Sequence, residues 1–157
     1  MEELELKSVI QVCQPNELRP EEQHLLTLAI EATSRSYAPY SNFHVGAAVL
    51  LENGAEVIGC NQENAAYPSG LCAERTALFS AGAQYPDVPV RVLAIAARGT
   101  DGELLEEPVA PCGSCRQVII ESETRAGSPI RILLHGRKCI YVVDGIQKLM
   151  PLMFSEF

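Results

Sequence analysis

A continuous apolar run, VPVRVLAIAAR at residues 88–98, limits the folds open to this chain. Its length and its β-branched residues predict a strand buried on both faces of a sheet. Upstream, residues 43–60 place two apolar segments on either side of Asn53-Gly54. This dipeptide tolerates the positive φ of a tight turn, so the segment predicts a β-hairpin.

Helical patterns alternate with these strands. Residues 19–37 begin with a proline and acidic residues and continue with an apolar helical repeat, which is typical of a helix N-terminus. The predicted elements besides the hairpin and the apolar run are helices at about 19–37, 72–83 and 113–122, strands at 130–135 and 138–143, and a short helix at 145–150. The order α-β-β-α-β-α-β-β-α favours a mixed sheet layered between helices.

The composition narrows the class of protein. A chain of 157 residues predicts one domain, residues 1–157, and a net charge of −8 disfavours a nucleic-acid partner. No apolar segment approaches the roughly 20 residues that span a bilayer, and the acidic, alternating start is unlike a signal peptide. We therefore expect no membrane association and a cytoplasmic location. In that setting the six cysteines indicate metal binding or catalysis rather than disulfides.

Three cysteines lie at the starts of two predicted helices. They are Cys72 in LCAERTALF, and Cys112 and Cys115 in PCGSCRQVII. Residues three apart at a helix start lie on one face, and the free N–H groups and helix dipole there stabilise thiolates. Two such starts facing each other would hold a zinc ion with three thiolates and leave its fourth position open, as in catalytic sites.

The neighbours of Cys72 fit such a site. Glu74 follows it by two residues and could accept a proton from water, and Arg75 could balance the thiolate charge. Other interpretations stay open at this point. A lone C-x-x-C also fits a redox pair, half of a zinc ribbon or two core thiols. A structural zinc site could take its fourth ligand from Cys60, Cys139 or His135.

The pairing of C-A-E with P-C-x-x-C matches the signature of zinc nucleobase deaminases. From about Ser36 to the C-terminus the chain resembles the small, homotetrameric cytidine deaminases. The motifs that carry the resemblance are YSNFHVGAAVL, GCNQENAAYPSGLCAERTALF, PCGSCRQVI and LMPLMF. The resemblance implies a three-layer α/β/α fold with a mixed five-stranded sheet, and it leaves residues 1–20 as an N-terminal extension.

The resemblance also implies roles for individual residues. One zinc ion per subunit would be held by Cys72, Cys112 and Cys115, with Glu74 as the catalytic proton shuttle and Arg75 acting through the thiolates. Substrate contacts would come from Asn61 and Glu63 at the ribose, from Phe43 at the pyrimidine, from Ala73, and from Tyr67 and Phe154, which reach a neighbouring subunit's site. His44 stands where the family often has proline, and its expected place is a strand edge.

The expected activity is the hydrolytic deamination of cytidine, and of 2′-deoxycytidine, in pyrimidine salvage by a homotetramer. Glu74 would take a proton from the attacking water and deliver it to ring N3 and then to the leaving amine. Two alternatives stay open: a deaminase acting on a nucleoside antibiotic such as blasticidin S or on a nucleic-acid base, and a zinc-binding module without catalysis. The NQEN stretch favours a free ribonucleoside, and Glu74 disfavours a purely structural site.

Overall fold

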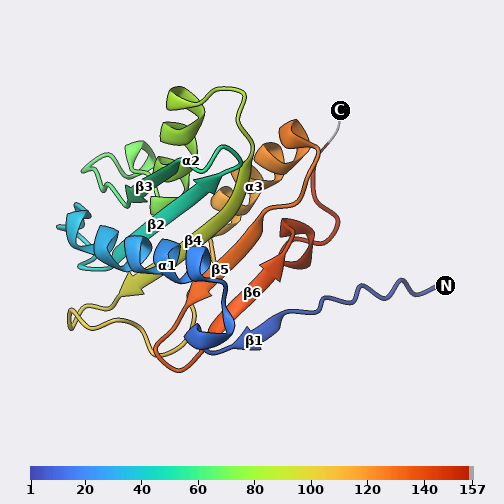
Figure 1. Cartoon of the computed structure of the whole chain (residues 1–157), viewed down its shortest axis with the longest axis horizontal. Coiled ribbons are helices and arrows are strands. Elements are labelled where there is room, and N and C mark those ends of the chain that lie inside the picture. The colour runs from blue at the N-terminus through green and yellow to red at the C-terminus, as the bar shows by residue number, and fades with distance from the viewer. Residues whose placement is uncertain (156–157) are drawn as a thin grey trace.

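The computed structural model describes residues 1–155 and centres on one sheet with the strand order β1-β6-β5-β4-β2-β3 (Figure 1). Strands β4 and β5 pair in parallel, and the other neighbouring strands pair antiparallel. The sheet is therefore mixed, as predicted. The strands are β1 Gln11–Cys13, β2 His44–Leu51, β3 Glu56–Cys60, β4 Val90–Arg98, β5 Arg131–His135 and β6 Ile140–Asp144.

The sheet has six strands, so the expected number of five is wrong by one. The additional strand is β1, which lies within the predicted N-terminal extension and pairs with β6 from Gln11–Val142 to Cys13–Ile140. A three-residue strand is too short for its own pattern to separate it from coil. Its conformation is decided by the edge of β6, which offers unpaired backbone groups to any segment that reaches it.

Helices cover both faces of the sheet, which confirms the three-layer arrangement (Figure 1). Successive residues of β4 point to opposite faces. Leu93 and Ile95 pack with α2 and α3, whereas Val92 and Ala94 pack with α1. The helices are α1 Pro20–Ala32, α2 Ala73–Gln84 and α3 Gly113–Ala126, with short 3-10 turns η1 Pro15–Glu17, η2 Thr33–Arg35, η3 Tyr67–Ser69 and η4 Ile146–Lys148.

Some helix ends differ from the sequence expectation. The α1 helix stops at Ala32 and continues only as the η2 turn, because the hydroxyls of Thr33 and Ser34 donate to the carbonyls of Ile30 and Glu31. The expected helix at 145–150 is the single turn η4. Within residues 1–155, no helix has both the length and the apolar character required to cross a membrane.

Candidate active site

The first turns of α2 and α3 bring the three predicted cysteines together. Cys72 and Cys112 are the N-cap residues of α2 and α3, and Cys115 lies in the first turn of α3, where it is fully buried. All three sulfur atoms lie within 4.8 Å of one another, and the Sγ atoms of Cys72 and Cys112 are 3.8 Å apart. None of these thiols is in a disulfide. Two motifs separated by 40 residues thus form one cluster of sulfur atoms.

The cluster fits a zinc ion. With a Zn–S distance of about 2.3 Å, two sulfurs on a tetrahedral ion are separated by about 3.8 Å. The Cys72–Cys112 distance matches this separation. Both helix starts also direct free N–H groups and a positive dipole end toward the sulfurs, which favours thiolates. Three thiolate donors would leave the fourth position for a water molecule.

Hydrogen bonding distributes the charge unequally among the thiols. The bond from Cys115, and then the Arg75 guanidinium, lower the pKa of Cys72 from 9.0 to about 5. The pKa of Cys115 is raised, because its thiol donates a hydrogen bond to the sulfur of Cys72 and because it is buried. Cys72 therefore ionises readily, whereas full ionisation of the cluster requires a cation to offset the accumulated negative charge.

Arg75 is the cation that faces this cluster. Its Nη2 lies 3.7 Å from the Sγ of Cys72. Its buried Nε has no hydrogen-bond partner among the residues that the structure describes. The predicted position of Arg75 beside the thiolates is therefore the one that the structure shows.

Glu74 is 4% exposed and lies next to the sulfur cluster. Its pKa is raised, first by burial and then by the charge on Cys72. A buried carboxyl with a raised pKa is suited to exchanging protons with a group bound beside it. Its position at the second residue of α2, directly after the N-cap Cys72 and Ala73, follows from the C-A-E spacing.

Two adjoining hollows open beside this cluster. The inner cavity, about 270 Å³, contains Glu74, Cys112 and an apolar wall, and the outer hollow, about 460 Å³, lies toward the surface. Four residues line both, namely Ser41, Asn61, Glu63 and Cys72. The apolar wall of the inner cavity consists of Phe43, Val45, Ile95, Val109 and Ala110. The combination of an apolar wall with a few polar groups is typical of small-molecule sites.

Asn61 and Glu63 are both bonded to the segment that carries Phe43. Asn61 Nδ2 donates to the Phe43 carbonyl at 2.9 Å, and Asn61 Oδ1 accepts from the Val45 N–H at 2.8 Å. Glu63 Oε2 accepts from the N–H of Tyr40 at 2.8 Å. These bonds hold the two predicted sugar-binding side chains and the predicted pyrimidine-binding ring around one cavity.

The other predicted substrate residues lie outside the inner cavity. Tyr67 is 75% exposed at the rim of the outer hollow, where its ring meets Tyr40 edge-on with centroids 5.9 Å apart. Phe154 is exposed, and its carbonyl accepts from Gln117 Nε2 at 2.9 Å. Ala73 is the first residue of α2, and its side chain packs in the core. The described chain thus brings together Phe43, Asn61, Glu63, Glu74 and the three cysteines.

Sequence reasoning missed several residues that line the site, above all Ser41. The sequence feature that could have indicated Ser41 is its place in the turn before Phe43, in a segment dense with turn-forming residues. The partner of its hydroxyl, Glu63, is 22 residues away, and no local pattern reveals that contact. Val109 and Ala110 directly precede the P-C-x-x-C motif and could have been included with it.

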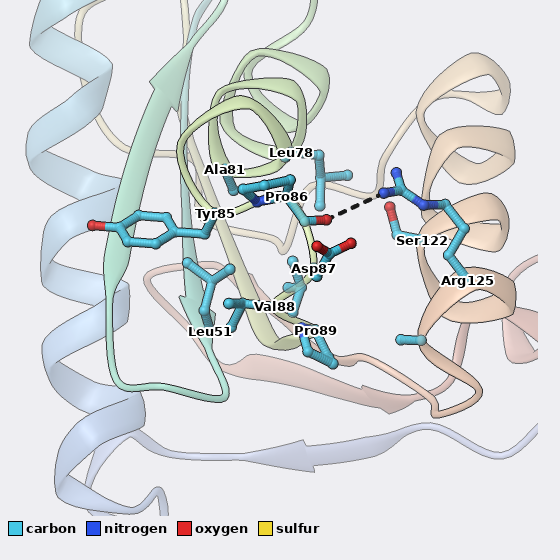
Figure 2. Close-up of a pocket in the computed structure, with 13 residues that line it drawn as sticks. Leu51, Leu78, Ala81, Tyr85, Pro86, Asp87, Val88, Pro89, Ser122 and Arg125 are labelled. Atoms are coloured by element: carbon cyan, nitrogen blue, oxygen red, sulfur yellow. Dashed lines mark hydrogen bonds between the residues drawn. The ribbon is translucent and has the colours of Figure 1, made fainter.

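A separate cavity of about 180 Å³ lies between the end of α2, the turn after it and α3 (Figure 2). Figure 2 shows Arg125 reaching across it, with its Nη2 donating to the Pro86 carbonyl at 3.4 Å. No predicted site residue lines this cavity, and the sulfur cluster is not part of it. The predicted metal ligands and Glu74 therefore lie apart from this cavity, at the starts of α2 and α3.

Comparison with known proteins agrees with this geometry. The family described as "Cytidine and deoxycytidylate deaminase zinc-binding region" matches residues 19–127. A cytidine deaminase of Sporosarcina psychrophila is 39% identical over 134 residues, which are 85% of this chain and 91% of the relative. A cytidine deaminase of Halalkalibacterium halodurans is 46% identical over 99 residues, which are 63% of this chain and 70% of the relative.

Solved structures show the same fold. The crystal structure of cytidine deaminase from Burkholderia pseudomallei superposes with a TM-score of 0.72 at 38% identity, over 83% of this chain and 97% of that chain. The enzyme from Mycobacterium tuberculosis gives a TM-score of 0.66 at 29% identity, over 88% of this chain and all of that one. The region that the family matches, residues 19–127, includes both helix starts that carry the cysteines.

Proposed function

Since this chain belongs to the family of the cytidine and deoxycytidylate deaminase zinc-binding region, we propose that it hydrolyses cytidine to uridine and ammonia. The observation that carries this proposal is the cluster of three thiols within 4.8 Å, with the buried Glu74 in the same cavity. A zinc site with an adjacent proton carrier is what hydrolytic deamination requires. A site with a purely structural role has no need of Glu74.

Cys72, Cys112 and Cys115 are the residues that would hold the zinc ion. Zinc bound there supplies a Lewis acid, which makes a water molecule nucleophilic near neutral pH. Glu74 accepts the proton of the attacking water as the new C–O bond forms at C4 of the cytosine ring. Glu74 then protonates N3. It next takes the proton of the new C4 hydroxyl and delivers it to the exocyclic amine, so that the C4–N bond breaks, ammonia leaves and the C4 carbonyl of uridine forms.

The remaining residues of the site bind the nucleoside. Phe43 and its apolar neighbours contact the pyrimidine ring, while Asn61 and Glu63 bond the ribose hydroxyls. Deoxycytidine is a further substrate, because one hydroxyl remains for these groups. Ala73 contacts the nucleoside through its backbone, since its side chain packs in the core.

The assembly in this proposal is a homotetramer that acts in pyrimidine salvage in the cytoplasm. The exposed rings of Tyr67 and Phe154 support the assembly, because they are apolar groups at the surface, and Tyr67 lies at the rim of the outer hollow. All six cysteines are free thiols, which suits a reducing compartment.

The direct test is to mix the purified protein with cytidine and follow the absorbance change on conversion to uridine, with zinc measured per chain. The proposal expects rapid deamination with one zinc per chain. Zinc without turnover of cytidine or deoxycytidine would refute the substrate assignment. A protein that binds no zinc under any condition would refute the proposal at its first step.

A further inference from the structure

The hydroxyl of Ser41 links two parts of the candidate site. It accepts the Phe43 N–H at 3.1 Å and donates a short hydrogen bond to Oε1 of Glu63. The second oxygen of Glu63 is held separately, by the N–H groups of Tyr40 at 2.8 Å and Ser41 at 3.3 Å. One carboxylate is thus anchored at both oxygens by two adjacent residues, Tyr40 and Ser41, in the segment before β2.

The segment before β2 is also restrained at its two ends. The hydroxyl of Ser36 forms a hydrogen bond with Nδ1 of His44, eight residues further along the chain, and this bond closes the turn that carries Ser41. His44 is half-buried there at the start of β2. The backbone that presents Ser41 is therefore restrained on both sides of the turn, so its hydroxyl meets Glu63 in a defined place.

Ser41 and Glu63 also share a special location. Both line the inner cavity and the outer hollow, so their hydrogen bond lies where the two meet. The Ser41 hydroxyl lowers the pKa of Glu63, together with the two backbone N–H groups. An ionised Glu63 accepts hydrogen bonds only. Its Oε2 already accepts from two N–H groups, whereas its Oε1 accepts from one hydroxyl and can accept from a second donor.

We propose that Ser41 is a positioning residue that sets the preference for substrates with sugar hydroxyls, because it holds Glu63 ready to accept from them and ties it to Phe43. This inference rests on the proposed function, in which Glu63 binds the sugar. Without the Ser41 hydroxyl, Oε1 of Glu63 loses its protein donor. Within the described chain, Glu63 is then held only through Oε2, by the N–H groups of Tyr40 and Ser41. The half-buried carboxylate can therefore turn Oε1 to several orientations, and binding of a sugar hydroxyl must first select one of them.

The test compares four proteins on two substrates. The proteins are the wild type, Ser41→Ala, Ser41→Thr, which retains a hydroxyl, and Ser34→Ala. Ser34 is a matched control, since it is an exposed serine whose hydroxyl, among the described residues, bonds the nearby Glu31 carbonyl and no part of the site. The substrates are cytidine and 2′,3′-dideoxycytidine, which lacks both hydroxyls that Glu63 could bind. Zinc per chain, thermal unfolding and calorimetric binding of uridine are measured alongside the kinetics.

For Ser41→Ala we expect kcat/KM for cytidine to fall by about tenfold, as for the loss of a hydrogen bond to a charged group. This loss should appear as a higher KM, with kcat unchanged. Dideoxycytidine kinetics, zinc content and thermal unfolding should stay unchanged. Ser41→Thr should restore the cytidine preference, and Ser34→Ala should match the wild type. An equal loss on both substrates, or an unchanged preference, overturns the role of Ser41 alone. A zinc-loaded wild type without turnover of either substrate overturns the proposed function and this inference with it.

Discussion

Gly59 on β3 packs directly against the backbone of Ala77 on α2. A β-carbon at position 59 would lie 2.4 Å from the Ala77 nitrogen and 2.6 Å from the Ala73 carbonyl oxygen. Both contacts fall on the first two turns of α2, the helix that begins after Cys72 and carries Glu74. The distance between this strand and this helix therefore helps to determine where a metal ligand and the proposed proton carrier lie.

Gly59→Ala should push the start of α2 away from the sheet. We expect a loss of stability of about 1–3 kcal/mol, as for overpacking of a tight core, together with reduced zinc content. The control is Gly82→Ala on the same helix, where a β-carbon has no heavy atom within 4 Å. That variant should be as stable as the wild type or slightly more so, because alanine favours helix. Thermal unfolding and zinc per chain distinguish the two, and full zinc binding with unchanged stability in Gly59→Ala would contradict the prediction.

The parts of the fold that follow local chemistry were predictable from the sequence. The hairpin turn is one, since Gly54 adopts a φ of 85° where the Asn-Gly dipeptide predicted a tight turn. The helix starts at Cys72 and Cys112 are another, because both motifs contain the ligands and the first helical residues together. The zinc cluster could be predicted because its ligands lie within one helix turn of each motif, where the sequence spacing decides which side chains share a face.

The parts that depend on distant partners were not predictable. Strand β1 forms because β6 presents a free edge, and nothing in its three residues indicates a strand. Likewise the Ser41–Glu63 bond depends on how the turn before β2 folds over the loop after β3. Such contacts follow from the packed sheet, whereas the motifs record only which residue types are present.

Glu74→Gln should leave zinc binding intact and reduce turnover of cytidine by on the order of 100- to 10,000-fold, the usual contribution of a general acid–base group. Glu74 must be ionised to accept a proton, and burial raises its pKa above 4.5. The wild-type rate should therefore fall as the pH drops through that raised pKa, and the variant should lose this dependence. Steady-state kinetics across pH with zinc analysis checks both statements.

A suitable control for Glu74→Gln is Glu107→Gln. The carboxylate of Glu107 lies at the surface, where it pairs with Lys138 at 3.0 Å. We expect that variant to keep the wild-type rate and pH profile. Undiminished turnover in zinc-loaded Glu74→Gln would exclude Glu74 as the proton carrier.

Arg75→Ala should weaken zinc retention at low pH. The guanidinium helps to lower the pKa of Cys72 to about 5, so its removal raises that pKa and lets protons compete with the metal at a higher pH. The midpoint of zinc release in a pH titration should therefore shift upward, while the preference for cytidine over other substrates stays the same. Arg91→Ala, which removes a surface pair with Glu21, should leave the midpoint in place. An unchanged midpoint and unchanged kinetics in Arg75→Ala would show that the arginine does not act through the thiolate.

Arg116 joins the zinc-binding turn to the C-terminal segment. Its Nε donates to the carbonyl of Pro111 at 2.8 Å, directly before Cys112, and its Nη1 donates a short bond to the carbonyl of Leu149. A glutamine at this position keeps polar donors but is too short to reach both carbonyls. Arg116→Gln should therefore loosen the turn that orients Cys112.

Since partners that orient metal ligands are worth about 10- to 100-fold in metal affinity, we expect Arg116→Gln to bind zinc more weakly by that factor. Competition with a chromogenic chelator measures this affinity. Arg125→Gln is the control on the same helix, because within residues 1–155 the Arg125 side chain donates its hydrogen bond to the Pro86 carbonyl at 3.4 Å, far along α3 from Cys112. If the two variants release zinc alike, the two carbonyl bonds of Arg116 do not position the ligand.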